Sequence, residues 1–142
     1  MITSVFEKTF SVADDKLDIA WERLNRRESF VDGQIFPYKV EFDAVTQQGP
    51  FEEGELNIHH GPFLSVHGRI GEISRDYRGL EYFYGSYVIS FRLIRPVKLE
   101  FFREEYGIRL VLTAFVNPAF EKVWLWGNRK FWRFAGISFL WR

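Results

Sequence analysis

Apolar side chains follow two different periods along this chain, and each period predicts a different kind of element. Residues 2–12 alternate between apolar and polar positions, which predicts a strand. In residues 13–24 the apolar side chains fall three and four positions apart, which predicts an amphipathic helix that begins at two aspartates. Residues 25–33 are consistent with a second short helix that ends at Gly33.

Period-two alternation dominates the middle of the chain. It predicts six further strands, at residues 38–44, 55–60, 63–72, 86–94, 97–102 and 107–116. Turn-forming pairs lie between the alternating runs: Gly49-Pro50, Gly61-Pro62, Arg78-Gly79, Arg95-Pro96 and Tyr106-Gly107. Because each strand has one apolar and one polar face, we expect an antiparallel sheet with one buried side.

Residues 117–142 return to a helical period. Asn117 suits a helix cap and Pro118 suits the first helical turn. The apolar stripe of this helix comprises Phe120, Val123, Trp124, Gly127, Phe131, Phe134, Ala135, Ser138 and Trp141. A helix of this length extends about 35 Å, so it can cover the apolar face of a small sheet. A second seam, of Leu125, Trp132 and Phe139, either fills the sides of a curved sheet or contacts a second copy of the chain or a membrane surface.

Composition limits the possible functions. The length of 142 residues suits one domain spanning 1–142, and no linker, repeat or low-complexity segment divides it. The absence of cysteine excludes disulfides and thiolate chemistry. Net charge is zero, so we expect no nucleic-acid partner. No basic segment leads into an apolar run, and no such run approaches about 18 residues, so we expect a cytoplasmic protein.

The order of predicted elements, with "LDIAWERL" in the first helix and "NPAFEKVW" entering the last one, resembles the START-related SRPBCC superfamily over nearly the whole chain. This resemblance implies an α+β helix-grip fold, in which a curved antiparallel sheet of about six to seven strands wraps around a long C-terminal helix. It also implies a cavity for a lipid, sterol or aromatic molecule. Some members are cyclases or dehydratases and others bind partners, so the resemblance does not fix a chemistry. The glycine-rich loop of the plant-allergen branch is absent, so we do not expect that branch's ligands.

We predict that the cavity is lined by inward-facing side chains, most of them apolar: Phe42, Ile58, Val66, Tyr87, Phe91, Leu110, Leu112, Trp124 and Phe131. The leading hypothesis is a non-catalytic binding module for a small lipid-like or aromatic molecule, without a cofactor. Its affinity would come from buried apolar area, at roughly 25 cal/mol per Å². An alternative hypothesis is an interaction protein whose cavity is filled by its own rings and which dimerises through the last helix.

Four polar side chains are candidates to orient a ligand: Lys8, Glu81, Tyr82 and Tyr84. Lys8 has the parity of inward-facing positions, so it either meets an acidic ligand group or lies at the sheet edge. The tyrosines either hold a ligand hydroxyl or carbonyl or are ordinary strand residues. Glu81 beside a tyrosine would allow proton transfer, which makes a cyclase or dehydratase the second functional hypothesis.

The three histidines do not predict a metal site. His60 and His67 share a face, but about four residues, or roughly 13 Å, separate them along the sheet. His59 points to the opposite face, and no acidic residue completes a ligand set. We therefore expect no bound metal.

Overall fold

The computed structural model describes residues 1–32, 39–61, 64–87 and 93–135. The strands are β1 (Ile2–Ser11), β2 (Lys39–Phe42), β3 (Leu56–Gly61), β4 (Leu64–Ile73), β5 (Tyr77–Tyr87), β6 (Ile94–Glu104) and β7 (Gly107–Val116). The helices are α1 (Asp14–Leu24), α2 (Arg27–Asp32), the 3₁₀ turn η1 (Pro118–Phe120) and α3 (Glu121–Ala135).

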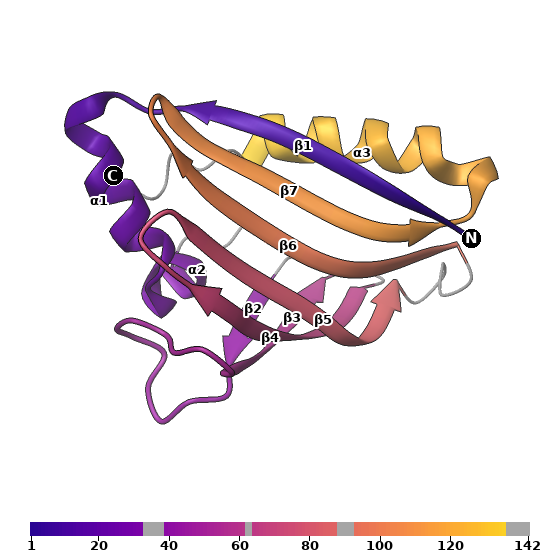
Figure 1. The fold of residues 1–142 in the computed structure, drawn as a ribbon. Coiled ribbons are helices and arrows are strands. Elements are labelled where there is room, and N and C mark those ends of the chain that lie inside the picture. The colour runs from indigo at the N-terminus through magenta and orange to yellow at the C-terminus, as the bar shows by residue number, and fades with distance from the viewer. Residues whose placement is uncertain (33–38, 62–63, 88–92, 136–142) are drawn as a thin grey trace.

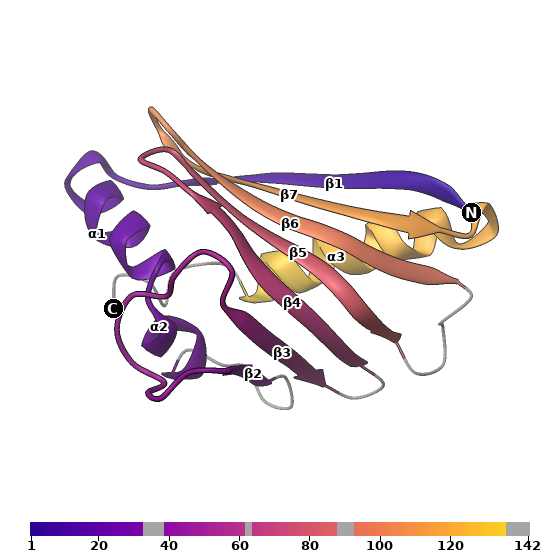
Figure 2. The ribbon, with the colours of Figure 1, turned by 60° about the horizontal axis from the view of Figure 1, so that its bottom comes forward.

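The strands form one seven-stranded antiparallel sheet in the order β1-β7-β6-β5-β4-β3-β2. The first strand, β1, pairs with the last, β7, over its full length, from Ile2 opposite Val116 to Ser11 opposite Gly107. The sheet curves, and α3 runs along one side of it, which we call the inner face, while α1 and α2 lie at one end (Figures 1 and 2). The predicted helix-grip architecture is confirmed.

The core lies on the inner face. Its most completely buried apolar side chains come from β4, β5, β6, β7 and α1: Val66, Ile70, Leu80, Phe101, Ile108, Leu110, Ala114, Val116, Ala20 and Leu24. The helix stripe predicted for α1 is confirmed, because its buried residues are Leu17, Ala20, Trp21 and Leu24. Ala13 occupies the N-cap without a side-chain hydrogen bond, so the aspartates that follow it act through the helix dipole alone.

Two of the predicted turns are wrong, because Arg78-Gly79 lies inside β5 and Arg95-Pro96 lies inside β6. At position 79 a Cβ atom would approach the Tyr77 hydroxyl to 2.8 Å, so glycine makes room for the Tyr77 ring. Pro96 adjoins a register shift of β6, where a missing backbone N–H is tolerated. Both pairs therefore have local reasons to occur within a strand.

The inward stripe of α3 is rotated relative to the prediction. Trp124 is buried, but its predicted neighbour Val123 is exposed. Leu125 and Trp132, which we expected on a separate seam, pack against the core, and Phe139 lies outside the described residues. The observed orientation places two tryptophans against the sheet, whereas the predicted stripe includes Gly127, which has no side chain to bury.

Candidate functional site

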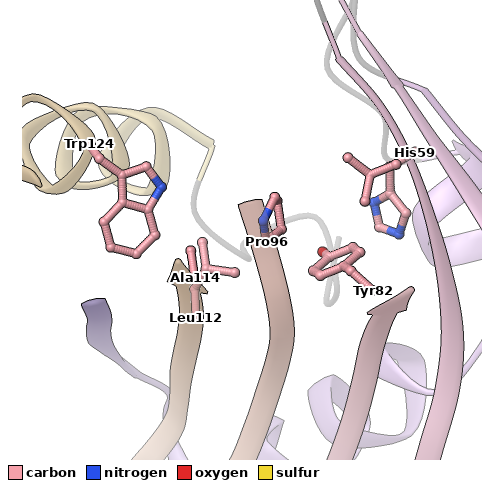
Figure 3. Close-up of a pocket in the computed structure, with 7 residues that line it drawn as sticks. His59, Tyr82, Pro96, Leu112, Ala114 and Trp124 are labelled. Atoms are coloured by element: carbon pink, nitrogen blue, oxygen red, sulfur yellow. The ribbon is translucent and has the colours of Figure 1, made fainter. Parts of the chain in front are cut away.

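A small pocket lies between the inner face of the sheet and α3 (Figure 3). Its lining residues are His59 of β3, Val66 of β4, Tyr82 of β5, Pro96 of β6, Leu112 and Ala114 of β7, and Trp124 of α3. The pocket volume is about 80 Å³. That volume is enough for several waters but lies well below the roughly 300–1,000 Å³ of sites for drug-sized ligands. The pocket as it stands therefore suits a small molecule.

The pocket has an apolar side and a polar side. In Figure 3 the Trp124 ring projects from α3 on one side, and His59 and Tyr82 lie together on the other. Leu112 and Ala114 lie between them, nearer the helix. A ligand in this space would touch an indole and aliphatic groups along most of its surface and meet polar atoms at one end.

A buried asparagine holds the histidine in place. His59 Nε2 donates a hydrogen bond to Asn57 Oδ1 at 2.9 Å, and Asn57 itself is only 2% exposed. The His59 ring meets the Tyr82 ring edge-on, with centroids 5.5 Å apart. Gly68 makes this arrangement possible, because a Cβ there would approach both Asn57 Oδ1 and a Leu80 methyl to 2.8 Å. The imidazole orientation is therefore fixed by packing and by a hydrogen bond.

The predicted alternation of β3 is reversed. His59 pairs with Val66 and Ile58 pairs with His67, so His59 and Val66 share one face and Ile58 lies on the other. The side chain of Val66 lines the pocket, which places His59 on the inner face and Ile58 on the outer face. The expectation that Ile58 faces the cavity was therefore wrong. Polarity misled the assignment, since the inward residues of this strand, Asn57 and His59, are polar ones that satisfy each other.

The other predicted wall residues fall into three groups. Val66, Leu112 and Trp124 line the pocket. Phe42 and Leu110 are buried elsewhere: Phe42 stacks on Phe51 with centroids 5.6 Å apart, and Leu110 lies within the core. Phe131 is 36% exposed and is not among the residues that line this pocket. The side chain of Tyr87 and the whole of Phe91 lie outside the described residues.

The predicted polar side chains lie in different places. Tyr82 lines the pocket. Lys8 is half-buried on the inner face of β1, with its Nζ 5.6 Å from the centroid of the Phe10 ring. Glu81 is exposed and follows the opposite alternation from Tyr82, so it does not form a cavity acid/base pair with that tyrosine. The Tyr84 side chain lies outside the described residues.

The sequence interpretation missed a cation buried on the inner face. Arg78 is 3% exposed and lies on the same face of β5 as Leu80 and Tyr82. Its guanidinium carbon is 5.0, 4.5 and 5.3 Å from the ring centroids of Phe30, Phe51 and Phe101. Burial lowers the pKa of Arg78 to about 9, so the side chain remains charged at neutral pH. Period-two counting through residues 78, 80 and 82 would have found it, had Arg78-Gly79 not been interpreted as a turn.

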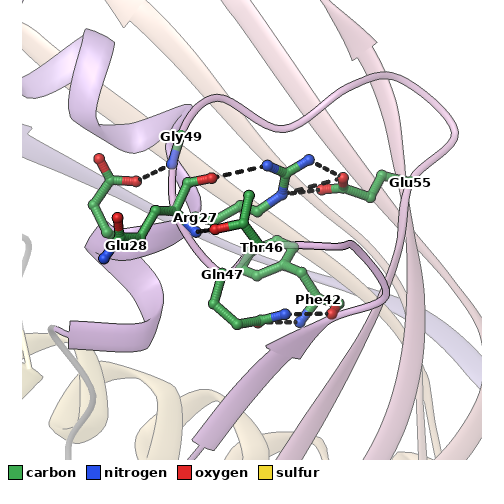
Figure 4. A network of polar contacts seen from close by, with 8 residues as sticks. Arg27, Glu28, Phe42, Thr46, Gln47, Gly49 and Glu55 are labelled. Atoms are coloured by element: carbon green, nitrogen blue, oxygen red, sulfur yellow. Dashed lines mark hydrogen bonds and ion pairs between the residues drawn. The ribbon is translucent and has the colours of Figure 1, made fainter.

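A polar network joins α2 to the loop after β2 (Figure 4). Arg27 of α2 forms an ion pair with Glu55 and donates from Nη1 to the Gln48 carbonyl oxygen at 2.9 Å. The Gly49 amide donates to Glu28 Oε2 at 2.7 Å and the Arg27 amide to the Gly49 carbonyl at 2.8 Å. We call these contacts the α2 clamp. Because they fasten the loop after β2 to α2, they bring Phe51 of the loop to Phe30 of the helix, with centroids 6.2 Å apart.

Electrostatics within the α2 clamp favour its charged forms. The hydrogen bond with Glu55 raises the pKa of Arg27. Burial opposes ionisation of Glu28, but hydrogen bonds from Arg26 and from backbone amides outweigh it and lower the pKa of Glu28. Elsewhere in the described residues, no three histidine or acidic side chains gather to hold a metal ion. None of the helices described is both long and apolar enough to span a bilayer.

Comparison with known proteins gives structural neighbours only. No family model matches this sequence, and no curated protein matches it. The structure is similar to that of a major latex-like protein from Panax ginseng, with a TM-score of 0.58 and 10% identity over 88% of this chain and 90% of that one.

Two structures of norcoclaurine synthase from Thalictrum flavum are also similar. A point mutant in complex with a transition-state analogue has a TM-score of 0.56 and 14% identity over 86% of this chain and 81% of that one. The complex with dopamine and hydroxybenzaldehyde has a TM-score of 0.56 and 13% identity over 86% and 75%. At such identities the likeness establishes a shared fold and leaves the activity to be argued from the site.

Proposed function

We propose that this chain, which has the helix-grip fold of the START-related SRPBCC superfamily, binds a small and mainly apolar molecule between its sheet and α3. The observation that carries the proposal is the composition of the pocket. Trp124, Leu112 and Ala114 supply apolar surface, and His59 and Tyr82 supply a few polar atoms at one side. Predominantly apolar walls with a small number of fixed polar groups are typical of ligand sites.

Binding would draw on two kinds of contact. The indole of Trp124 and the side chain of Leu112 would bury ligand surface, which stabilises the complex by roughly 25 cal/mol per Å² of apolar area. The Tyr82 hydroxyl and the His59 ring would orient one ligand hydroxyl or carbonyl. Because Asn57 already fixes the His59 ring, this polar contact costs little additional side-chain ordering.

A pocket-filling substitution tests the proposal. Ala114 is almost fully buried in the pocket wall, so Ala114→Leu adds volume where the ligand would lie. We expect calorimetric titration with the neutral probe 4-phenylbutanamide to show binding to the wild type and at least about tenfold weaker binding to Ala114→Leu, a loss of about 1.4 kcal/mol.

Ala119→Leu provides the matched control, because Ala119 is exposed in η1 and the substitution adds the same volume outside the pocket. This control should bind the probe as the wild type does. A wild type that binds no probe, or a folded Ala114→Leu variant with unchanged affinity, would contradict the proposal.

A second candidate function is catalysis of proton transfer. The observation that favours it is the contact between an oriented imidazole, His59, and a phenol, Tyr82, in the wall of the pocket. An imidazole of this kind can act as a general base near neutral pH. The fold is shared with norcoclaurine synthase, whose structures include one with dopamine and hydroxybenzaldehyde.

The two candidates separate in an incubation with those two compounds. If the chain is a binding module only, chromatography will show no product beyond that of the buffer blank. A product formed by the wild type and lost in His59→Gln would assign the chain to the enzymes instead.

A further inference from the structure

The Arg78 side chain is a buried cation, and no carboxylate among the described side chains pairs with it. Neither its Nε nor its Nη1 atom has a hydrogen-bond partner in the part of the chain that the structure describes. An arginine is rarely buried unless an acidic group pairs with it. The three phenylalanine rings around it attract the positive charge, but a ring face cannot accept hydrogen bonds as a carboxylate does.

Three carboxylates of the described structure have other partners or another orientation. Glu55 pairs with Arg27, and Glu100 accepts a hydrogen bond from the Tyr77 hydroxyl at 2.7 Å. Glu81 is exposed and follows the opposite alternation from Arg78 along β5. The guanidinium therefore has N–H donors for which the described residues provide no acidic acceptor.

The cation and one residue of the pocket wall lie on the same face of one strand. Arg78 precedes Tyr82 by four residues on the same face of β5, about 13 Å along the strand. Tyr82 lines the pocket. Along β5, Tyr82 is therefore the pocket-lining residue on the face that also carries Arg78.

Lys8 adds positive charge along the same row of the sheet. Arg78 pairs with Phe101, Phe101 with Leu110 and Leu110 with Lys8, so Arg78 and Lys8 stand on one face at opposite ends of this row. The inner face therefore carries two cations around its apolar floor. This potential favours a ligand with a negative group over a neutral one.

We propose that Arg78 is an anion receptor that takes the carboxylate of a small apolar acid whose body occupies the pocket beside Trp124. This inference rests on the proposed binding function and names the chemical class of its ligand. A planar carboxylate matches the planar donor edge of a guanidinium. A singly charged acid also suits this site better than a phosphate, since Arg78 is the one fully buried cation among the described residues and the pocket is small.

A pair of probes that differ only in charge tests the proposal. We would titrate 4-phenylbutyrate and 4-phenylbutanamide by calorimetry at pH 7 into the wild type and into Arg78→Met. The wild type should bind the acid at least about tenfold more tightly than the amide. Arg78→Met, which retains the length and apolar stem of the side chain, should bind the two probes equally within about twofold.

Arg75→Met is the matched control, because Arg75 is exposed in the turn before β5 and its loss changes the net charge by the same amount. This variant should keep the preference for the acid. Equal affinity of the wild type for acid and amide would overturn the proposal, as would a preference that survives in Arg78→Met.

A second measurement separates failure of this inference from failure of the proposed function. The Arg78 Nε–H signal in a nitrogen-15 NMR spectrum, assigned by its absence in Arg78→Met, should shift on addition of 4-phenylbutyrate and stay in place with sodium chloride. A third titration, with sodium acetate, shows whether a carboxylate without an apolar body is enough to shift the Arg78 signal. If the amide fails to bind while acetate moves the signal, the apolar pocket is wrong and the anion site stands. If no carboxylate moves the signal, the anion site is wrong.

Discussion

At the scale of single residues, burial of the Arg78 guanidinium opposes folding of the ligand-free protein. The unpartnered donors lose their hydrogen bonds to water on folding, which costs about 1–3 kcal/mol for each buried group and more for a charged one. Three aromatic contacts offset part of this cost. Functional groups often carry such a penalty, because a fully satisfied cation would have nothing to offer a ligand.

The lowered pKa predicts how stability depends on pH. Burial lowers the pKa of Arg78 from its ordinary value in the unfolded chain to about 9 in the folded protein. Between these values the unfolded chain binds more protons, so the free energy of unfolding rises with pH, by up to about 1.4 kcal/mol per unit. Between pH 8.5 and pH 10 the free energy of unfolding of the wild type should therefore rise by roughly 1 kcal/mol more than that of Arg78→Met.

Urea denaturation at a series of pH values measures this difference, in which the titrations of other groups cancel. Arg75→Met serves again as the control. Its free energy of unfolding should rise with pH as much as that of the wild type does. Parallel pH profiles for the wild type and Arg78→Met would show that Arg78 titrates in the folded protein as it does in the unfolded chain.

Residue identity was enough to predict the apolar residues of the site but not its polar residues. Leu112 and Trp124 followed from strand and helix periods, because their apolar character agrees with their position in the pocket wall. His59 and Arg78 did not, because polar side chains on an inner face break the rule that inward means apolar. The strand pairing shows on which face such a residue lies: His59 pairs with Val66 and therefore shares its face.

At the scale of elements, the α2 clamp joins the loop after β2 to the helix that carries Phe30. Arg27 and Glu55 are well covered, with 12% and 9% of their side chains exposed. Removal of one partner from a buried pair leaves a charge without compensation. The aromatic contacts around Arg78 depend on this loop, because Phe51 belongs to it.

We predict that Arg27→Met lowers the free energy of unfolding by about 3 kcal/mol and that Arg27→Met/Glu55→Leu recovers part of the loss. Arg26→Met is the comparison, because the Arg26–Glu28 pair is more exposed, at 37% and 28%, and should contribute less than about 1 kcal/mol. Urea denaturation of the four proteins provides the test. If Arg27→Met and Arg26→Met lose the same free energy of unfolding, the buried pair contributes no more to stability than the exposed pair.

The elements themselves were predictable to different degrees. The stripe of α1 and the alternation of β7 were clear, because each has a long regular period on one buried face. β5 was not recognised as one long strand, since its glycine and arginine resemble turn residues and its register shifts beside Gly68. The orientation of α3 also escaped prediction, because apolar side chains surround the helix and only contact with the sheet selects a face.

At the scale of the whole molecule, the helix-grip architecture places a long helix against a curved sheet and leaves a small pocket between them. The order of strands and helices along the sequence carried the family resemblance that implied this architecture, and the structure has the same order of elements. The size of the pocket was not predictable, since it depends on how side chains from five strands and α3 pack together.

The most direct test of ligand binding compares two tryptophans of one helix. Trp124 lines the pocket, whereas Trp126 is 55% exposed, so their indole N–H signals provide an internal comparison during an NMR titration with 4-phenylbutanamide. Our account predicts that the Trp124 signal shifts and saturates while the Trp126 signal stays in place. If the Trp124 signal does not move, or if both signals move together without saturation, the molecule does not bind its ligand between the sheet and α3.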